Sequence, residues 1–274
     1  MKKIYVLLLF ILAMTVNAHA YSFKVNGLCY LINSDNKSVT VTAESSSYPR
    51  YTSLSGSVNI PASVTYGGKT YTVTKIDTGA FMSCTGITSV TIGNSVTSIG
   101  QMAFYICSGI TSVTIGNSVT TINAQAFVGC TAMKTLTIPS SVTSIGQMAF
   151  YGCEKLANIY SKITNPGNVT MGSSVFSNVP TSTCVLHIPK GTLSKYKTAS
   201  QWKDFTNKVE DQSGTLLGDL DGNGLIEVND VVKLAEIAMG GSMNGVTLSV
   251  ADIDHNGKIE VNDVVKLAEI AMGS

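Results

Sequence analysis

The sequence predicts a β-rich solenoid of 23-residue repeats, followed by a small all-α domain that contains two acidic loops. Three observations lead to this fold class. Cys84, Cys107, Cys130 and Cys153 stand 23 residues apart. Each is followed by the pattern apolar-x-x-apolar-x-apolar, which is typical of the strand in repeats of about 20–29 residues. Residues 227–240 and 260–273 share one fourteen-residue sequence, offset by 33.

The N-terminus has the composition of an export signal. Met1-Lys2-Lys3 is positively charged, Ile4 to Val16 is an apolar run, and Ala18-His19-Ala20 is a small-x-small cleavage site. The run is shorter than the ~20 residues that a helix needs to cross a bilayer. We therefore expect a signal peptide over 1–20, cleaved after Ala20, and a mature protein that is secreted or held at the cell surface with no transmembrane segment.

The charge distribution divides the remaining chain in two. Residues 21–213 carry thirteen Lys/Arg and seven Asp/Glu, a balance of +6, and residues 214–274 carry three Lys and ten Asp/Glu, a balance of −7. A boundary is expected near 206–217. Only 13% of residues are charged and basic runs are absent, so nucleic acid is not an expected partner.

The predicted elements follow in chain order. Residues 21–57 are expected to form an N-terminal β cap, a hairpin of 23–25 with 39–41. The solenoid covers 58–206, beginning with an incomplete unit over 58–73 that turns at Gly67-Gly68 and ending in a strand-plus-helix cap around 186–202. A second short strand is expected after each turn of the four clear units. A linker over 207–217 leads to the acidic domain over 218–274.

The interior of the solenoid should contain a ladder of aromatic rings. An Ala-Phe pair precedes each repeat cysteine, with the phenylalanines at Phe81, Phe104, Phe127 and Phe150. No single repeat can bury its own apolar face, so stacked repeats form one continuous core. The cysteines should lie beside the rings. Export permits disulfides, but a buried cysteine also behaves as a small hydrophobic residue, and free thiols are the favoured interpretation.

The repeats closely resemble the BspA-like leucine-rich-repeat family of bacterial surface proteins. The family unit runs Ile-x-x-Ile-x-x-x-Ala-Phe-x-x-Cys-x-x-Leu-x-x-Ile-x-Ile-Pro, and the match covers about residues 58–205. The resemblance implies a curved β-solenoid and adhesion to host or neighbouring-cell proteins, with no catalysis. This chain has fewer repeats than the fuller members.

The residues between the buried strand positions are mostly serine and threonine, and they form either a solvated face or a ligand face. The ligand, a protein or a glycan, is not named by the sequence. These positions are Thr88, Ser89, Thr91, Thr111, Ser112, Thr114, Lys134, Thr135, Thr137, Ala157, Asn158 and Tyr160.

Two acidic loops, 219–230 and 252–263, have the spacing of calcium sites. Calcium takes six to eight oxygens, which a 12-residue loop supplies from positions 1, 3, 5, 7 and 12, with position 9 often acting through water. We therefore expect two calcium ions. The expected ligands are Asp219, Asp221, Asn223, Leu225 (carbonyl), Glu227 and Asp230 in the first loop, and Asp252, Asp254, Asn256, Lys258 (carbonyl), Glu260 and Asp263 in the second.

A pair of EF-hands would need a helix entering each loop and usually ends the loop on Glu. A loop followed by an exiting helix, twice, with Asp last, instead resembles the type I dockerin module. The resemblance implies calcium-dependent docking of residues 218–274 onto a cohesin-like partner. The family's recognition positions fall on Val228-Asn229 and Val261-Asn262. Scaffold-binding members usually have small hydroxyl residues there, so the identity of the partner stays open.

The sequence contains no recognisable catalytic set. After the signal peptide the histidines are His187, on an expected strand, and His255, inside a loop. The solenoid has no paired-carboxylate signature of a glycoside hydrolase. The sequence therefore favours a secreted or cell-surface non-catalytic binding protein. The alternatives are a purely structural subunit of an extracellular multiprotein complex and a polysaccharide-associated accessory protein.

Overall fold

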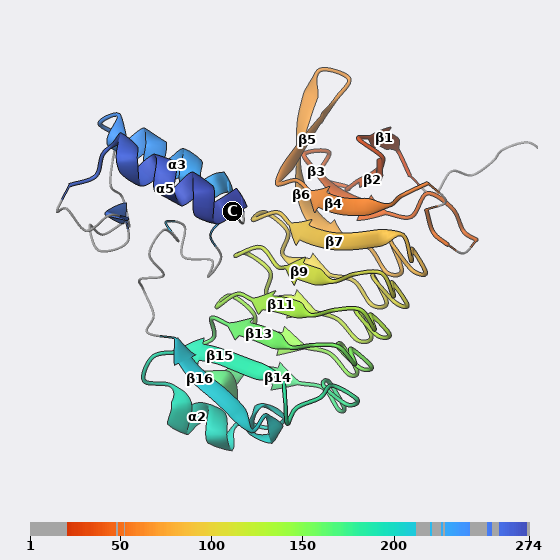
Figure 1. Ribbon diagram of the computed structural model, residues 1–274. Coiled ribbons are helices and arrows are strands. Elements are labelled where there is room, and N and C mark those ends of the chain that lie inside the picture. Colours follow the sequence, from red (N-terminus) through yellow and green to blue (C-terminus); the bar gives the residue numbers. More distant parts are fainter. Residues whose placement is uncertain are drawn as a thin grey trace, which may run out of the picture.

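The computed structural model describes residues 21–47, 49–51, 53–211, 220, 226, 228–241, 251–253 and 258–272. The expected signal peptide lies outside the described residues. Figure 1 shows a stack of β-coils, and two helices that follow later in the chain.

Successive coils of the solenoid contribute strands to two sheets. Sheet A has the order β1 (Phe23–Val25), β2 (Leu28–Ile32), β3 (Ser38–Thr42), β6 (Lys69–Ile76), β8 (Ser98–Ile99), β10 (Thr121–Ile122), β12 (Ser144–Ile145) and β14 (Thr170–Met171), with β5 (Ser63–Tyr66) paired to β6. Sheet B has the order β4 (Gly56–Ile60), β7 (Ile87–Ile92), β9 (Ser112–Thr114), β11 (Thr135–Ile138), β13 (Asn158–Ser161), β15 (Val185–Pro189) and β16 (Asn207–Asp211).

The 23-residue period becomes the register of the sheets. In sheet B, Val113 pairs with Val90 on one side and Leu136 on the other, so equivalent residues of successive coils lie in line. Side chains alternate between the two faces of a strand, and these three side chains are at most 1% exposed. The second short strands expected after each turn are confirmed as the end of β6 and as β8, β10 and β12.

The expected cap at the C-terminal end of the solenoid is confirmed. It consists of β15, the helix α2 (Leu193–Thr198) and the 3-10 helices η1 (Pro166–Asn168) and η2 (Trp202–Asp204). Tyr196 and Trp202 are fully buried there. Sheet B then continues through β16, which pairs in parallel with β15. Residues 207–211, expected to begin a linker, are therefore part of the solenoid.

The aromatic ladder is confirmed, and it is longer than expected. The centroid distances are 4.9 Å for Phe81–Phe104, 5.0 Å for Phe104–Phe127 and 5.3 Å for Phe127–Phe150, with the rings nearly parallel. Tyr51 stacks on Phe81 at 5.2 Å, and Phe176 stacks on Phe150 at 5.7 Å. Because each coil repeats the last by a translation, identical rings keep the same orientation along the whole core.

The cysteines are buried free thiols, as expected. Three repeat thiols approach the carbonyl oxygen of a phenylalanine in the preceding coil: Cys107 Sγ lies 3.0 Å from Phe81 O, Cys130 Sγ 3.3 Å from Phe104 O and Cys153 Sγ 3.5 Å from Phe127 O. Burial raises the pKa of Cys29 to about 11 and of Cys153 to about 12. These thiols therefore keep their protons, and those of Cys107, Cys130 and Cys153 donate to carbonyl groups inside the core.

The raised thiol pKa values predict that the solenoid loses stability in alkali. An unfolded cysteine ionises near pH 8.5, whereas folded Cys153 holds its proton up to about pH 12. Its stabilising effect is present in full below the unfolded pKa and is lost as pH rises towards the folded pKa, at about 1.4 kcal/mol per pH unit. Urea denaturation at about pH 8 and about pH 10 measures this slope.

The matched variant for this prediction is Cys153→Ser, which keeps a donor near Phe127 O but does not ionise in this range. The free energy of unfolding of this variant should fall less steeply with pH than that of the unmodified protein, by the contribution of the one thiol that was removed. Equal slopes for the two proteins would contradict the assignment of Cys153 as a buried thiol that resists ionisation.

The N-terminal cap has one more strand than the expected hairpin. Residues 23–25 do not pair with 39–41; β1 pairs with β2, and β2 pairs with β3, both antiparallel. The β1–β2 turn is Asn26-Gly27, with φ of 49° and 81°. Asn-Gly is a strong signal for a two-residue hairpin turn because both positions need positive φ, so the sequence contained the evidence for this strand.

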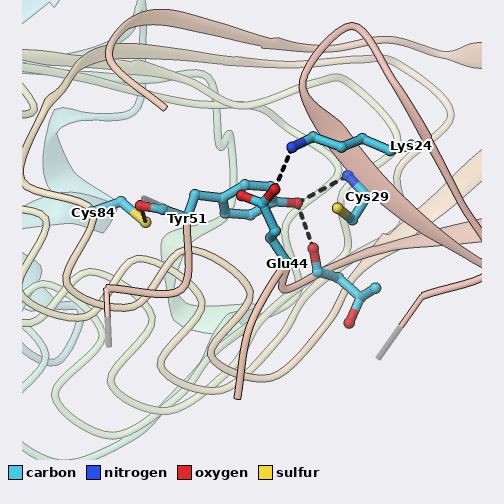
Figure 2. Close-up of polar contacts among 6 residues, drawn as sticks. Lys24, Cys29, Glu44, Tyr51 and Cys84 are labelled. Carbon is cyan, nitrogen blue, oxygen red and sulfur yellow. Dashed lines mark hydrogen bonds and ion pairs between the residues drawn. The ribbon is translucent and has the colours of Figure 1, made fainter. Parts of the chain in front are cut away.

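Tyr51 joins the N-terminal cap to the first coil (Figure 2). Its hydroxyl donates to the carbonyl of Thr42 and accepts from the backbone N–H of Cys29 at 3.0 Å. Its ring begins the aromatic ladder, and its backbone carbonyl lies 3.9 Å from Cys84 Sγ. Lys24 and Glu44 form an ion pair beside it. A tyrosine in this place ends the row of phenylalanines while satisfying polar groups of the cap.

Two repeat positions have left-handed backbone, and one of them carries a β-branched residue. Ser83, Ile106, Gly129 and Gly152 occupy equivalent places in successive coils, all with φ between 56° and 73°. Left-handed backbone costs a non-glycine residue roughly 1–2 kcal/mol, and a β-branched residue is an outlier there. Ile106 is also 43% exposed, so it gains little from burial.

Relief of this strain is partly offset because glycine makes the unfolded chain more flexible. We therefore expect Ile106→Gly to raise the free energy of unfolding by a net amount of about 0.5–1 kcal/mol. Thermal or urea denaturation measures the gain. Ile106→Val keeps the β-branch and should give none. A glycine variant less stable than the valine variant would argue against strain at this position.

Candidate ligand-binding surfaces

The outward face of sheet B carries two straight rows of mainly polar side chains. The first row is Ser57, Ser89, Ser112, Thr135, Asn158, Val185 and Asn207, and the second is Asn59, Thr91, Thr114, Thr137, Tyr160, His187 and Val209. The sequence expected most of these residues at the surface. Thr137 is the exception at 4% exposure, since its in-register neighbour is the bulky Tyr160.

Tyr160 and His187 form the aromatic part of this face. Their rings stack at 4.3 Å with 13° between the planes, and His187 Nε2 lies 3.2 Å from Asn158 Oδ1. His187 is on a strand, as expected. Its neighbours are an aromatic ring and an amide, so the arrangement is suited to packing and hydrogen bonding.

A groove of about 420 Å³ lies where the strands of sheet B end. Its lining includes Asn59 of β4, Thr91 of β7 and Thr114 of β9, together with the turns that follow them. We call it the strand-end groove. The sequence analysis missed it. The available signal was that two consecutive turns, Gly93-Asn94 and Gly116-Asn117, have glycine where the turns on either side have proline.

The last residue of each acidic loop is a fully buried aspartate. Asp230 and Asp263 lie in the first turns of α3 (Val228–Ala238) and α5 (Val261–Met272) and are 0% exposed. Asp230 Oδ1 accepts the backbone N–H of Leu220 at 2.8 Å, and Asp263 Oδ1 accepts that of Ile253 at 2.8 Å. The same bond therefore brings the second and twelfth positions of each loop together.

The remaining expected calcium ligands divide into two groups. Asp252 is buried at 7% exposure, next to the bond that closes its loop, while Glu260 is half-buried and Lys258 is exposed. Asp219, Asp221, Asn223, Leu225, Glu227, Asp254 and Asn256 lie outside the described residues. Within the described part of the chain no three His, Cys, Asp or Glu side chains lie together as a metal site.

The two helices pack through Leu234 and Leu267, which are both fully buried. The expected partner residues stand at their N-termini: Val228 and Val261 are 68% and 69% exposed, and Asn229 and Asn262 are exposed as well. Val232 and Val265, one turn further along, are each 53% exposed. The helices are not fully equivalent, because Ile237 is buried whereas Ile270 is 47% exposed. Asn229 also borders the strand-end groove.

Among the described residues, no helix combines the length and the hydropathy that a membrane span requires.

Comparison with known proteins places the repeats in a family. Residues 74–197 match, in six copies, the family model described as BspA type leucine rich repeat region. A comparison with curated proteins finds no match.

Solved structures of bacterial leucine-rich-repeat proteins are similar to the chain. A leucine-rich-repeat protein of T. pallidum has 22% identity and a TM-score of 0.49, with 61% of this chain and 71% of that chain covered. One from Bacteroides capillosus has 30% identity and a TM-score of 0.42, with 51% and 97% covered. A leucine-rich cell surface protein from Faecalibacterium prausnitzii has 30% identity and a TM-score of 0.41, with 61% and 44% covered. The chain thus spans less than half the length of that last protein.

The 23-residue period, the stacked Phe and Cys positions and the six matched copies agree with one another. Residues 74–197 of this chain are therefore a BspA-type leucine-rich-repeat region.

Proposed function

We propose that this chain is an exported, non-catalytic binding protein whose solenoid serves as an adhesion or protein-interaction surface. The observation that carries the proposal is the outward face of sheet B, which runs without interruption across seven strands. Its two rows present mainly hydroxyl and amide groups, and the second row includes the Tyr160–His187 stack. Solenoids commonly use such extended surfaces for binding, and the export signal predicted from the sequence of residues 1–20 supports exposure of this surface outside the cell.

Adhesion assays with charged surface variants test this role. The double variant Ser89→Lys/Ser112→Lys places two bulky charges in the first row of sheet B. It should lose most of the adhesion that the full chain shows to immobilised extracellular matrix proteins and to bacterial cells. The matched control, Thr121→Lys/Ser144→Lys, makes the same change at paired positions of sheet A. Equal adhesion by the two double variants would remove the basis for assigning binding to sheet B.

For the C-terminal region we propose a dockerin-type module that binds two calcium ions and docks onto a cohesin-like partner. The buried Asp230 and Asp263 support the metal, because an ionised carboxylate is costly to bury unless it is paired or coordinates a cation. The loop-closing bonds hold the second and twelfth positions of each loop together, which suits a loop whose ligands must surround one ion. Bound calcium would neutralise the carboxylates. The ligands would be the twelve residues named from the loop spacing.

The exposed ends of the two helices support the docking proposal. Val228-Asn229 and Val261-Asn262, continued by Val232 and Val265, give each helix an exposed apolar edge beside a polar amide. Calorimetric titration against a panel of cohesin domains tests the docking. Binding should require calcium and should weaken in Val228→Lys/Val261→Lys. It should not weaken in Glu236→Ala, which changes an exposed side chain about two turns further along α3. Binding that persists in excess chelator would contradict calcium-dependent docking.

A further inference from the structure

The strand-end groove is a polar hollow beside the second row of sheet B. We propose that it binds a linear oligosaccharide that carries carboxylate groups. The inference rests on the binding role proposed above for the solenoid, and adds a ligand class and a place on the molecule. The volume, about 420 Å³, lies within the ~300–1,000 Å³ usual for sites of small ligands.

The solenoid side of the groove is formed by two glycine turns between two proline turns, and Asn229 of α3 also borders the groove. Pro61 and Pro139 stand at its ends, and Gly93 and Gly116 occupy the equivalent places between them. A Cβ on Gly93 would lie 2.7 Å from the backbone nitrogen of Ala62, and one on Gly116 would lie 2.5 Å from Gly93 O. Glycine therefore lets these two turns stack more closely than any side chain would allow, which hollows the row of turns.

The lining is suited to hydroxyl groups. Asn94 and Asn117 are exposed on adjacent turns, and Asn94 Oδ1 accepts the backbone N–H of Asn117 at 2.8 Å. This bond fixes the amide of Asn94 and leaves its Nδ2 donor outside it. Thr91 and Thr114 add hydroxyls. An amide offers a donor and an acceptor side by side, which matches neighbouring hydroxyls of a sugar ring.

The charge of the lining favours an acidic sugar. Among the described residues that border the groove, Lys162 is the charged one, and no carboxylate borders it. Lys162 is half-buried at one end of the groove, so its ammonium group is available to a carboxylate at that end of a ligand.

A peptide fits the same groove less well. Among the strands that end there, β7, β9 and β11 are paired on both sides within sheet B, and β4, at one end of the groove, is the edge strand of that sheet. Most of the groove therefore offers no free edge for strand addition. The lining has no aromatic side chain among its described residues, so it lacks the platform on which proline-rich peptides dock. Successive coils lie about 4.7–4.9 Å apart. An extended peptide advances ~3.3–3.4 Å per residue, so its residues would not stay in register with successive coils. Each sugar ring of an extended oligosaccharide advances by nearly the spacing of one coil.

Calorimetric titration of the full chain tests the proposal with three probes: a tetrasaccharide of alternating glucuronic acid and N-acetylglucosamine, neutral cellotetraose, and an extended tetrapeptide containing glutamate. The acidic tetrasaccharide should bind most tightly. Asn94→Ala/Asn117→Ala should weaken it about tenfold or more, the loss expected from two or more hydrogen bonds. Lys162→Ala should bring the affinity for the acidic tetrasaccharide down to that for cellotetraose.

The control variant is Asn168→Ala, an exposed asparagine of η1 that does not border the groove, and it should bind like the unmodified protein. Side-chain amide signals of Asn94 and Asn117, followed by NMR, should shift on adding the acidic tetrasaccharide. Absence of binding to either sugar, unchanged affinity in the double asparagine variant, or binding of the tetrapeptide alone would overturn the proposal. Failure of this proposal can be told apart from failure of the adhesion proposal, because the adhesion test changes Ser89 and Ser112, which do not border the groove.

Discussion

Replacing Phe127 with alanine should lower the free energy of unfolding of the solenoid by about 3–5 kcal/mol, the usual cost of removing a large aromatic side chain from a core. Phe127 is 0% exposed and lies between Phe104 at 5.0 Å and Phe150 at 5.3 Å. The substitution removes the stacking contacts with both neighbouring rings at once. It also leaves a cavity that the regular coils on either side cannot close. Urea denaturation of the full chain measures the loss.

Two variants make the ladder test specific. Phe127→Leu fills most of the volume and should cost clearly less than the alanine variant, because the cavity term is smaller. Tyr151→Ala removes a ring of similar size from a half-buried position in the next coil, outside the stack. A melting temperature for Phe127→Ala equal to that of Tyr151→Ala would show that the ladder contributes little to stability.

Calcium removal should unfold the C-terminal helices while the solenoid stays folded. Each loop concentrates carboxylates around a buried aspartate, Asp230 or Asp263, and these groups repel one another unless a cation neutralises them. About 60 residues bury too little apolar surface to offset this repulsion with a large margin. At a calcium concentration ~100-fold above Kd, each ion should add about 2.7 kcal/mol to the stability of the folded module.

Circular dichroism and calorimetry of the full chain measure both parts together. With calcium, titration should give two ions per chain, and excess chelator should remove the helical signal but leave the transition of the solenoid unchanged. Asp230→Asn and Asp263→Asn should each reduce the stoichiometry to one. Helix content that survives chelation, or a stoichiometry well below two, would contradict the calcium proposal.

The interior of the solenoid was predictable because residues one repeat period apart in the sequence lie next to each other in neighbouring coils. Residues 23 apart pair across neighbouring strands, as Val90 does with Val113, so one period is enough to place the phenylalanines in a ladder and the cysteines beside it. The exposed starts of α3 and α5 were also expected. By contrast, the sequence analysis missed β2 because it overlooked the Asn26-Gly27 turn, and it missed β16 because a short edge strand has no repeat signal.

The sequence by itself determined the period, the buried positions and the two acidic loops, since each depends on residue types at regular intervals. Only the tertiary structure decided the extension of the ladder to Tyr51, the loss of exposure at Thr137, the strain at Ile106 and the strand-end groove. Those features arise where one coil meets the next, or where the regular stack meets its caps. The groove at Gly93 and Gly116 exists because these residues lack a Cβ and so lie close to the backbone of the neighbouring coil. A linear sequence pattern does not show that distance between coils.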